Sequence, residues 1–219
     1  MTNYWDIRFL QHIDKNNVFT IFEVGARYGE ESIELSNIFD KSTLYSFECN
    51  PLTIEICRSN LLHMERVHFF PYGLGDSETI QPFYSYILNN DGASSLYKRI
   101  DFEQTQCKTG DISIRKITNI VKEYNIPSID ILCMDVQGYE LNILRGCDEF
   151  LLNVKYIIME EPKLIINTLY LPENVHSKYI GSPTSAEIAE FMVKHNFKEL
   201  CRIDENAIED NVLYVNTQL

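Results

Sequence analysis

The sequence predicts one α/β domain built on a mainly parallel β-sheet. Short apolar runs rich in β-branched and aromatic residues alternate along the 219-residue chain with segments of helical periodicity. Several of these runs end at a glycine or an acidic residue, as is typical of a buried strand that enters a tight turn. The chain shows no internal repeat, low-complexity tract or linker that would divide it into separate domains.

Composition limits the classes of function. Hydrophobic residues make up 45% and charged residues 23% of the chain, which is typical of a globular protein. The formal net charge is -13, and no cluster of Lys and Arg is visible. Because nucleic-acid binding requires clustered cations that displace counterions, we expect no nucleic-acid partner.

The six cysteines lack the short spacing of zinc or redox motifs. We expect buried free thiols in a reducing compartment rather than disulfides. The N-terminal residues do not resemble a secretory signal, and no apolar run reaches membrane-spanning length. We therefore expect a cytoplasmic protein with no membrane partner.

The stretch from Val18 to Gly29 organises the chain. Residues 18–24 read as a buried strand, Gly25 and Gly29 flank a turn, and a helical pattern follows. A strand, a glycine turn and a helix N-terminus bring backbone N–H groups to one point, where a ligand can approach closely. Glu23 interrupts the apolar run at the carboxyl end of the strand, where open α/β sheets bind ligands.

The remaining elements follow from periodicity and turn signals. Strands are expected at 42–48, 67–72, 80–87, 129–134, 154–159, 197–203 and 211–215, the last two forming a hairpin. Helices are expected at 4–13, from Asn50 and Pro51, at 114–124, at 140–144 with Gly146 as the C′ residue after it, and from a capping box of Thr184 and Glu187. Residues 88–112 and 163–183 are expected to be irregular.

Polar or glycine residues follow four of the expected strands at one edge of the sheet. These residues are Glu23 to Gly25, Glu48, Gly73 to Asp76, and Asp135. Glu48 lies 23 positions after Gly25, the distance at which an acid on the second strand can bind both ribose hydroxyls of a nucleoside. A carboxylate suits this role because it can accept from two hydroxyl donors at once.

Five sequence motifs along the chain resemble one known family. They are Glu23-Val24-Gly25-Ala26-Arg27-Tyr28-Gly29, Phe47-Glu48-Cys49-Asn50-Pro51, Gly73-Leu74-Gly75-Asp76, Gly92-Ala93-Ser94-Ser95-Leu96, and Met134 to Glu140 with Leu144-Arg145-Gly146. In this order, over about residues 18–162, they are similar to the FkbM-type methyltransferases, which use S-adenosylmethionine.

The resemblance implies a Rossmann-like, seven-stranded class I methyltransferase sheet, mostly parallel, with an antiparallel strand in a C-terminal hairpin. It divides the single domain of residues 1–219 into three parts. These are an N-terminal helix within 1–14, a cofactor-binding core at about 18–162, and an acceptor side with the hairpin at 163–219.

The resemblance also implies which residues contact S-adenosylmethionine. Gly25, Ala26 and Gly29 would line its methionine end, Glu48 would hold the ribose, and Asn50 would lie beside the adenosine. Gly75 and Asp76 would border the adenine, Asp135 would face the sulfonium and the methyl group, and Ser94 and Ser95 would close over the site. Glu23, Tyr28 and Cys49 belong to the same motifs and are expected beside the cofactor.

Two residues depart from the family pattern. Arg27 stands where the family often has Asn, which alters the expected binding of the cofactor's carboxylate. Gln137 stands where the family often has Glu, which argues against a catalytic role at this position.

Methyl transfer to a hydroxyl needs a base or a metal to remove the proton. Asp135 is the first candidate base, followed by Glu160 and Glu161 at the end of the fifth strand, and then by His176. The acids could also bind a divalent ion, but acids at a strand end are more often solvated, so no metal is expected.

We therefore expect an S-adenosylmethionine-dependent O-methyltransferase that acts on a hydroxyl of a carbohydrate or a related small metabolite. A nicotinamide-dependent oxidoreductase is the alternative enzyme, although the Gly-x-Gly-x-x-Gly motif is missing. A nucleoside-binding module that has lost catalysis is the non-enzymatic alternative.

Overall fold

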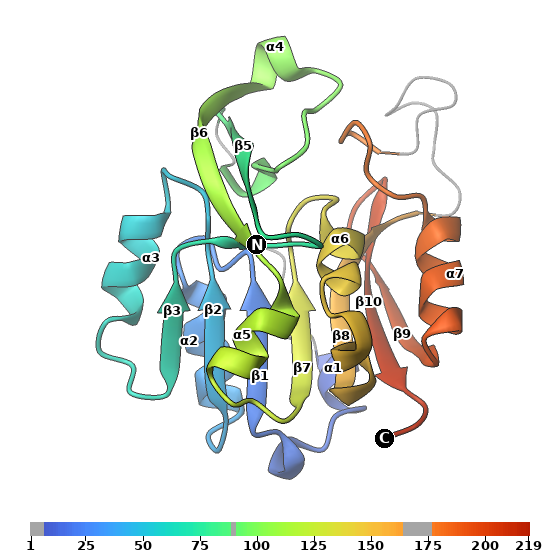
Figure 1. Ribbon diagram of the computed structural model, residues 1–219. Helices are drawn as coiled ribbons and strands as arrows, with labels where there is room; N and C mark the ends of the chain where they lie inside the picture. Colours follow the sequence, from blue (N-terminus) through green and yellow to red (C-terminus); the bar gives the residue numbers. More distant parts are fainter. Residues whose placement is uncertain (1–6, 89–90, 164–176) are drawn as a thin grey trace.

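The computed structural model describes residues 7–88, 91–163 and 177–219, which fold around a seven-stranded sheet (Figure 1). The strands lie in the order β3-β2-β1-β7-β8-β10-β9. Their bounds are β1 Thr20–Val24, β2 Thr43–Phe47, β3 Val67–Phe70, β7 Ile129–Met134, β8 Val154–Pro162, β9 Phe197–Asp204 and β10 Glu209–Asn216. Strand β10 is antiparallel to both neighbours, and the other pairs are parallel. The expected sheet with its antiparallel C-terminal hairpin strand is confirmed.

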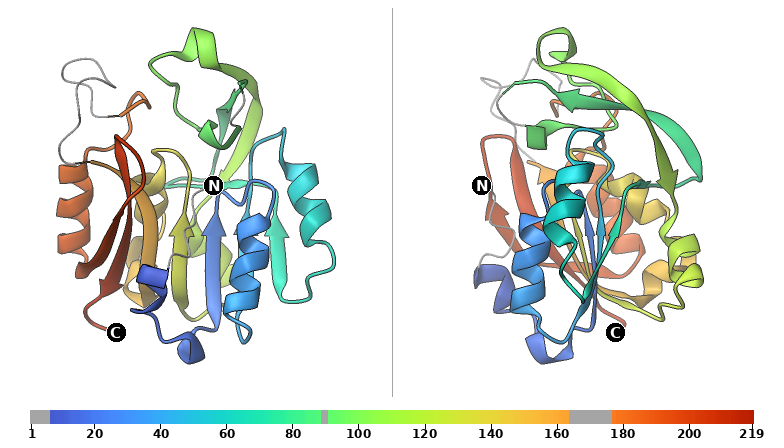
Figure 2. Two further views of the ribbon diagram at one scale, coloured as in Figure 1. Left: turned by 180° about the vertical axis from the view of Figure 1, so that it is seen from behind. Right: turned by 90° about the vertical axis from the view of Figure 1, so that its left-hand side faces the viewer.

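Helices cover both faces of this sheet (Figure 2). Their bounds are α1 Ile7–Leu10, α2 Glu30–Ile38, α3 Ile54–Leu61, α4 Phe102–Thr105, α5 Ile117–Glu123, α6 Glu140–Arg145 and α7 Ser185–Lys194. The 3-10 helices are η1 Lys15–Asn17, η2 Asp91–Ala93 and η3 Asp148–Asn153.

Successive residues of the central strands point into two different cores. Phe22 packs on the face covered by α5, α6 and α7, whereas its neighbour Ile21 packs on the face covered by α1 and α2. Leu132 and Ile131 of β7 divide in the same way. Both faces are therefore buried, which explains why these strands read as continuous apolar runs.

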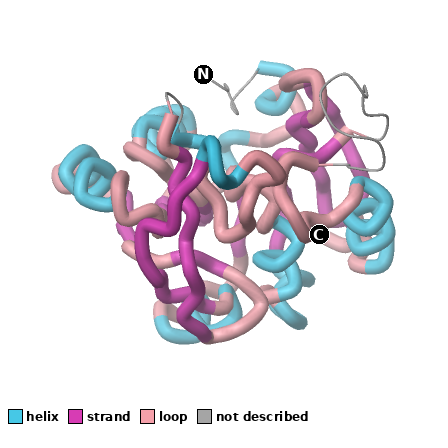
Figure 3. The backbone as a smooth tube through the Cα atoms, turned by 90° about the horizontal axis from the view of Figure 1, so that it is seen from above, coloured by secondary structure: helices cyan, strands magenta, loops and turns pink. Residues whose placement is uncertain are grey.

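A second, three-stranded sheet rises above the carboxyl ends of the main strands (Figure 1). It has the order β4-β6-β5, with β4 Gly73–Leu74, β5 Thr79–Tyr86 and β6 Gln106–Arg115. Figure 3 shows the long strands β5 and β6 side by side from above. The expectation that 88–112 is irregular was therefore wrong at its C-terminal end, where β6 lies.

Strand β6 was missed because most of its residues are polar and only a few are buried. The expected helix at 114–124 begins later, because its first two residues belong to β6. Ile114 and Arg115 pair with Gly73 and Leu74 as the end of β6, and α5 starts at Ile117.

Two expected helix boundaries also differ. Helix α3 begins at Ile54 with Thr53 as its N-cap, because Asn50 instead forms a turn in which its Oδ1 accepts from the backbone N–H of Leu52 at 3.0 Å. Gly146 ends α6 in a right-handed conformation, with a φ of -69°. A glycine is needed there for space, since a Cβ atom would lie 1.9 Å from the carbonyl oxygen of Gly75.

The described residues also bear on the expected helix cap, the cysteines and the N-terminal helix. Thr184 and Glu187 form the capping box of α7. All six cysteines are free thiols, and three of them are buried. Of the expected helix at 4–13, Ile7–Leu10 is helical, and residues 4–6 lie outside the described ranges. No helix in these ranges is both long enough and apolar enough to span a bilayer.

Candidate functional site

Two adjoining cavities lie at the carboxyl ends of the parallel strands. The first, called here the apolar cavity, spans about 640 Å³, and the second, called the acidic cavity, spans about 1220 Å³, both including space open to solvent. They meet at four residues that line both: Gly25, Arg27, Gly92 and Asp135. Open α/β sheets bind their ligands at this edge.

The turn after β1 forms the floor between the cavities. Gly25 has a φ of 94°, and a Cβ atom there would lie 2.0 Å from the carbonyl oxygen of Asp135, so this position requires glycine. The backbone N–H groups of Gly25 and Ala26 donate to the carbonyl of Phe47 at 2.9 and 3.0 Å, which ties the turn to β2. Gly29 starts α2 at a φ of 83° and lies outside both linings, packed against Leu61.

Glu48 presents a fixed carboxylate to the apolar cavity. Its Oε2 accepts from the backbone N–H of Arg27 and its Oε1 from that of Asn50, each at 2.5 Å. Burial raises the pKa of Glu48 to about 7, although these hydrogen bonds favour the charged form. Each oxygen keeps a second lone pair, so the carboxylate can still accept from a pair of ligand hydroxyls.

The other walls of the apolar cavity are largely nonpolar. Aromatic and aliphatic side chains supply them: Phe47, Tyr72, Leu74, Phe83, Leu96 and Tyr139. Cys49 and Asn50 also line the cavity, and burial raises the pKa of the Cys49 thiol. A carboxylate opposite apolar and aromatic surfaces suits a nucleoside, which has a ribose to bind and a base to stack.

The segment from Asp91 to Ser95 forms a roof over both cavities. Asp91 accepts from Nε of Arg27 at 2.8 Å and from the hydroxyl of Tyr28. Burial acts to raise the pKa of Asp91, but the hydrogen bonds from Tyr28 and Arg27 outweigh it and lower the pKa. Ser94 lines the apolar cavity, donates to the carbonyl of Asp91 at 2.6 Å and accepts from Asn50.

The acidic cavity carries many more acids than free cations. Its acidic lining residues are Glu30, Glu31 and Glu34 from α2, Asp135, Glu160, and Glu205 and Glu209 from the β9–β10 hairpin. Of its cations, Arg27 pairs with Asp91 and Arg99 pairs with Asp101. Burial, together with the charges of Glu23 and Asp135, raises the pKa of Glu31 to about 9.

Asp135 lies where the two cavities meet, within a hydrogen-bonded group of polar side chains. Gln137 donates from Nε2 to Asp135 at 2.6 Å and to Glu160 at 3.0 Å, and its Oε1 accepts from the hydroxyl of Tyr179. Burial and the nearby charge of Asp135 raise the pKa of Glu160 well above its usual value. The two first candidate bases are therefore joined through one amide.

Several residues expected beside a cofactor lie outside both cavity linings. Glu23 is buried beneath the turn, where it accepts from Ser32 and Ser46, and burial raises its pKa to about 7. Tyr28 and Ser95 stabilise the segment that forms the roof. The hydroxyl of Tyr28 donates to Asp91, and the hydroxyl of Ser95 donates to the carbonyl of Gln137 at 2.9 Å.

Gly75 and Asp76 lie outside the cavity lining that they were expected to form. Gly75 is packed against Ile114 and Tyr139, and Asp76 is exposed. The wall at this place is formed by Tyr72 to Leu74 instead, because the chain leaves the cavity where β4 pairs with β6.

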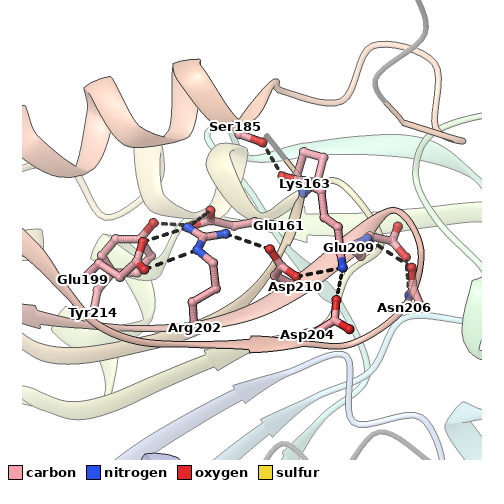
Figure 4. A network of polar contacts seen from close by, with 11 residues as sticks. Glu161, Lys163, Ser185, Glu199, Arg202, Asp204, Asn206, Glu209, Asp210 and Tyr214 are labelled. Atoms are coloured by element: carbon pink, nitrogen blue, oxygen red, sulfur yellow. Dashed lines mark hydrogen bonds and ion pairs between the residues drawn. The ribbon is translucent and has the colours of Figure 1, made fainter. Parts of the chain in front are cut away.

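Two further candidate bases are separated from Asp135. Glu161 points away from the acidic cavity into the hairpin network of Figure 4, where it accepts from Arg202 at 3.0 Å and from Tyr214 at 2.5 Å. His176 lies outside the described residues. Within the described ranges, no group of three or more His, Cys, Asp or Glu side chains is arranged to hold a metal ion.

Sequence patterns did not single out several residues of the site. Asp91 was read as part of a turn, and Arg99 falls in a stretch expected to be irregular. Tyr179 and Glu209 come from segments far along the chain. Local sequence periodicity does not indicate that such residues belong to the site, because contacts between distant parts of the chain bring them there.

The sequence matches a family model and two curated proteins. The model of the methyltransferase FkbM domain matches residues 23–199. The 2-O-methyltransferase NoeI of Sinorhizobium fredii is 25% identical over 158 residues, which cover 64% of this chain and 62% of NoeI. Methyltransferase sdnD of Sordaria araneosa is 25% identical over 157 residues, covering 59% of this chain and 60% of sdnD. The match therefore spans less than two thirds of either relative.

Solved structures share the fold at low sequence identity. A SAM-dependent methyltransferase from Aquifex aeolicus gives a TM-score of 0.52 at 11% identity, covering 95% of this chain and 87% of that one. Aeropyrum pernix fibrillarin, solved with natively bound S-adenosyl-L-methionine, gives 0.54 at 10% identity, covering 95% of this chain and 73% of that one.

Proposed function

The chain belongs to the FkbM methyltransferase family, which uses S-adenosylmethionine, and we propose that it transfers the methyl group to a hydroxyl of a carbohydrate or a related small metabolite. The family membership replaces the nicotinamide-dependent oxidoreductase considered from the sequence. The choice of a hydroxyl acceptor is supported by the similarity to a 2-O-methyltransferase.

The residues of the apolar cavity fit the adenosine part of this cofactor. The carboxylate of Glu48 is available for the ribose hydroxyls, and aromatic side chains such as Phe47 and Phe83 are available for the adenine. The glycine at position 25 leaves room for a close approach to the turn, where any side chain would collide with the backbone of Asp135.

One observation carries the proposal: the apolar cavity adjoins a second, polar cavity, and Asp135 lines both. A module that only binds a nucleoside has no use for an open cavity beyond the ligand. A methyltransferase needs one, since the acceptor must approach the methyl group from the side opposite the departing sulfur. We assign the acidic cavity to the acceptor.

S-adenosylmethionine supplies an electrophilic methyl group, so the new oxygen–carbon bond forms as the carbon–sulfur bond breaks and its electron pair remains on sulfur. The largest contribution of the protein is then the orientation of acceptor and donor. Asp135, which lines both cavities, is the proposed general base that takes the acceptor's proton. Glu160 lies in the acidic cavity behind it.

The test is transfer of a tritiated methyl group from S-adenosylmethionine to a panel of neutral monosaccharides and their methyl glycosides. We expect label in at least one sugar, and we expect its loss in the Asp135→Asn variant while the fold is retained. A control variant, Asp111→Asn on the exposed part of β6, should keep wild-type turnover. Label on an amine panel but on no hydroxyl compound would refute hydroxyl methylation.

A further inference from the structure

The side chain of Gln137 has all of its hydrogen-bonding groups engaged in the acidic cavity. A primary amide has two N–H donors and one carbonyl acceptor. Nε2 donates to Asp135 at 2.6 Å and to Glu160 at 3.0 Å, and Oε1 accepts from Tyr179. This pattern orients Nε2 toward the carboxyl groups, because an ionised Asp135 can only accept hydrogen bonds.

The backbone that carries Gln137 is held firmly as well. Its φ is 55°, in the left-handed region that few non-glycine residues adopt. Glu140 accepts from the backbone N–H groups of Val136 and Gly138 at 3.2 and 3.3 Å, and Ser95 donates to the carbonyl of Gln137. The backbone at Gln137 therefore cannot move without breaking contacts on both sides of the turn.

Asp135 and Glu160 would repel each other if both were ionised, and burial together with the charge of Asp135 raises the pKa of Glu160. They follow neighbouring parallel strands, β7 and β8, and both line the acidic cavity. The charged groups that face this pair from other elements are mostly acids, namely Glu31 of α2, Glu140 of α6, and Glu205 and Glu209 of the hairpin. The cations that face it are Arg99 and Lys178. Gln137 supplies a neutral donor to both carboxylates.

We propose, on the basis of the methyl transfer proposed above, that Gln137 is a positioning residue that holds Asp135 ionised and correctly oriented to receive the acceptor's proton. The amide N–H stabilises the negative charge of Asp135, while Glu160 on its other side is kept apart from Asp135. During transfer the acceptor oxygen bonds the methyl carbon, the sulfur keeps the electron pair of the broken bond, and the proton moves to the Asp135 carboxylate.

Tyr179 links this arrangement to the acceptor side of the chain. Its hydroxyl donates to Gln137, its ring lies beneath the guanidinium of Arg99 at 5.5 Å, and its side chain is buried. Removing this hydroxyl should loosen the amide without removing it. The Tyr179→Phe variant should therefore give a smaller effect than loss of the amide, in the same direction.

The test uses Gln137→Met, which keeps the length of an unbranched side chain and removes all three hydrogen bonds. The control is Gln104→Met, the same change at an exposed position on α4. Carbon-13 NMR of the side-chain carboxyls, in protein saturated with S-adenosylhomocysteine, follows the titration of Asp135 without an acceptor. We expect Gln137→Met to raise the Asp135 midpoint by about one pH unit, and the control to leave it unchanged.

A second measurement is the turnover rate of Gln137→Met, of Asp135→Asn and of the double variant, compared in a double-mutant cycle. Gln137→Met should lower kcat about tenfold with little change in the KM for S-adenosylmethionine, and should cost little more once Asp135 is already Asn. An unmoved Asp135 midpoint, or full additivity in the cycle, would overturn the role of Gln137. Failure of wild-type protein to bind S-adenosylhomocysteine would instead overturn the proposed function, so the two failures are distinguishable.

Discussion

The guanidinium of Arg27 donates from Nε to Asp91 over 2.8 Å and ties the roof of the site to the glycine turn. Both residues line the apolar cavity, and Arg27 and the adjoining Gly92 also line the acidic one. We expect a ligand that spans the two cavities to lie beneath this ion pair, and we expect the contact to slow its release.

Asp91→Ala should speed the release of S-adenosylhomocysteine about fivefold, as expected for the loss of about 1 kcal/mol from a partly exposed charged contact. Stopped-flow dissociation measures the rate. Asp111→Ala removes a comparable exposed ion pair with Lys108 on β6 and should leave the rate unchanged. A rate in Asp91→Ala equal to that of wild type would mean that the roof does not gate release.

Glu48→Ala should weaken cofactor binding by about 2 kcal/mol, the scale of losing hydrogen bonds to a charged group. The change is measured by calorimetric titration with S-adenosylhomocysteine. Glu55→Ala, an exposed glutamate on α3, is the matched control. Undiminished affinity in Glu48→Ala would show that this carboxylate does not hold the ribose.

The stability of the ligand-free protein should fall as pH rises from 5.5 to 7. Burial raises the pKa of Glu23 and Glu48 to about 7 and that of Glu140 to about 8, from 4.5. Between these values the folded state binds more protons than the unfolded state, so the free energy of unfolding decreases with pH. Each of these groups should contribute a fall of up to about 2 kcal/mol, the value for one carboxyl over about 1.5 pH units.

Urea denaturation at several pH values measures this slope, and Glu140→Gln isolates one contribution. Glutamine can still accept from Val136 and Gly138 through its carbonyl oxygen but cannot ionise. The variant should therefore show a flatter dependence than wild type between pH 5.5 and 8. A slope unchanged by Glu140→Gln would contradict the assignment of this carboxyl.

Gly146→Ala should destabilise the fold by about 3 kcal/mol, the scale of overpacking, because the new Cβ atom would collide with the backbone of Gly75. Gly110→Ala is the matched control, since its Cβ atom would meet Pro51 at an ordinary distance of 3.6 Å. Urea unfolding of both variants gives the comparison. Equal stability of the two would show that the turn after α6 can move to accept a side chain.

Most of the fold could be predicted because its strands are buried on both faces. The apolar runs of β1 and β7 predict buried strands. The acids and glycines that follow these runs predict the edge of the sheet at which the cavities lie. Strand β6 could not be predicted, since its residues are mainly polar and its pairing partner β5 decides its conformation.

The site divides in a similar way. Gly25, Glu48 and Asp135 could be predicted because each directly follows or ends a strand at the same edge. Asp91 and Tyr179 could not, because hydrogen bonds to Arg27 and Gln137 place them and no local pattern records those contacts. Asp76 lies outside the cavity lining, since the chain turns away from the cavity where β4 pairs with β6.

A crystal structure of the complex with S-adenosylhomocysteine tests the central claim most directly. We predict adenosine in the apolar cavity, both ribose hydroxyls on the carboxylate of Glu48, and the sulfur at the junction with the acidic cavity beside Asp135. Adenosine bound elsewhere, or a sulfur facing away from Asp135, would contradict the assignment of the two cavities to donor and acceptor.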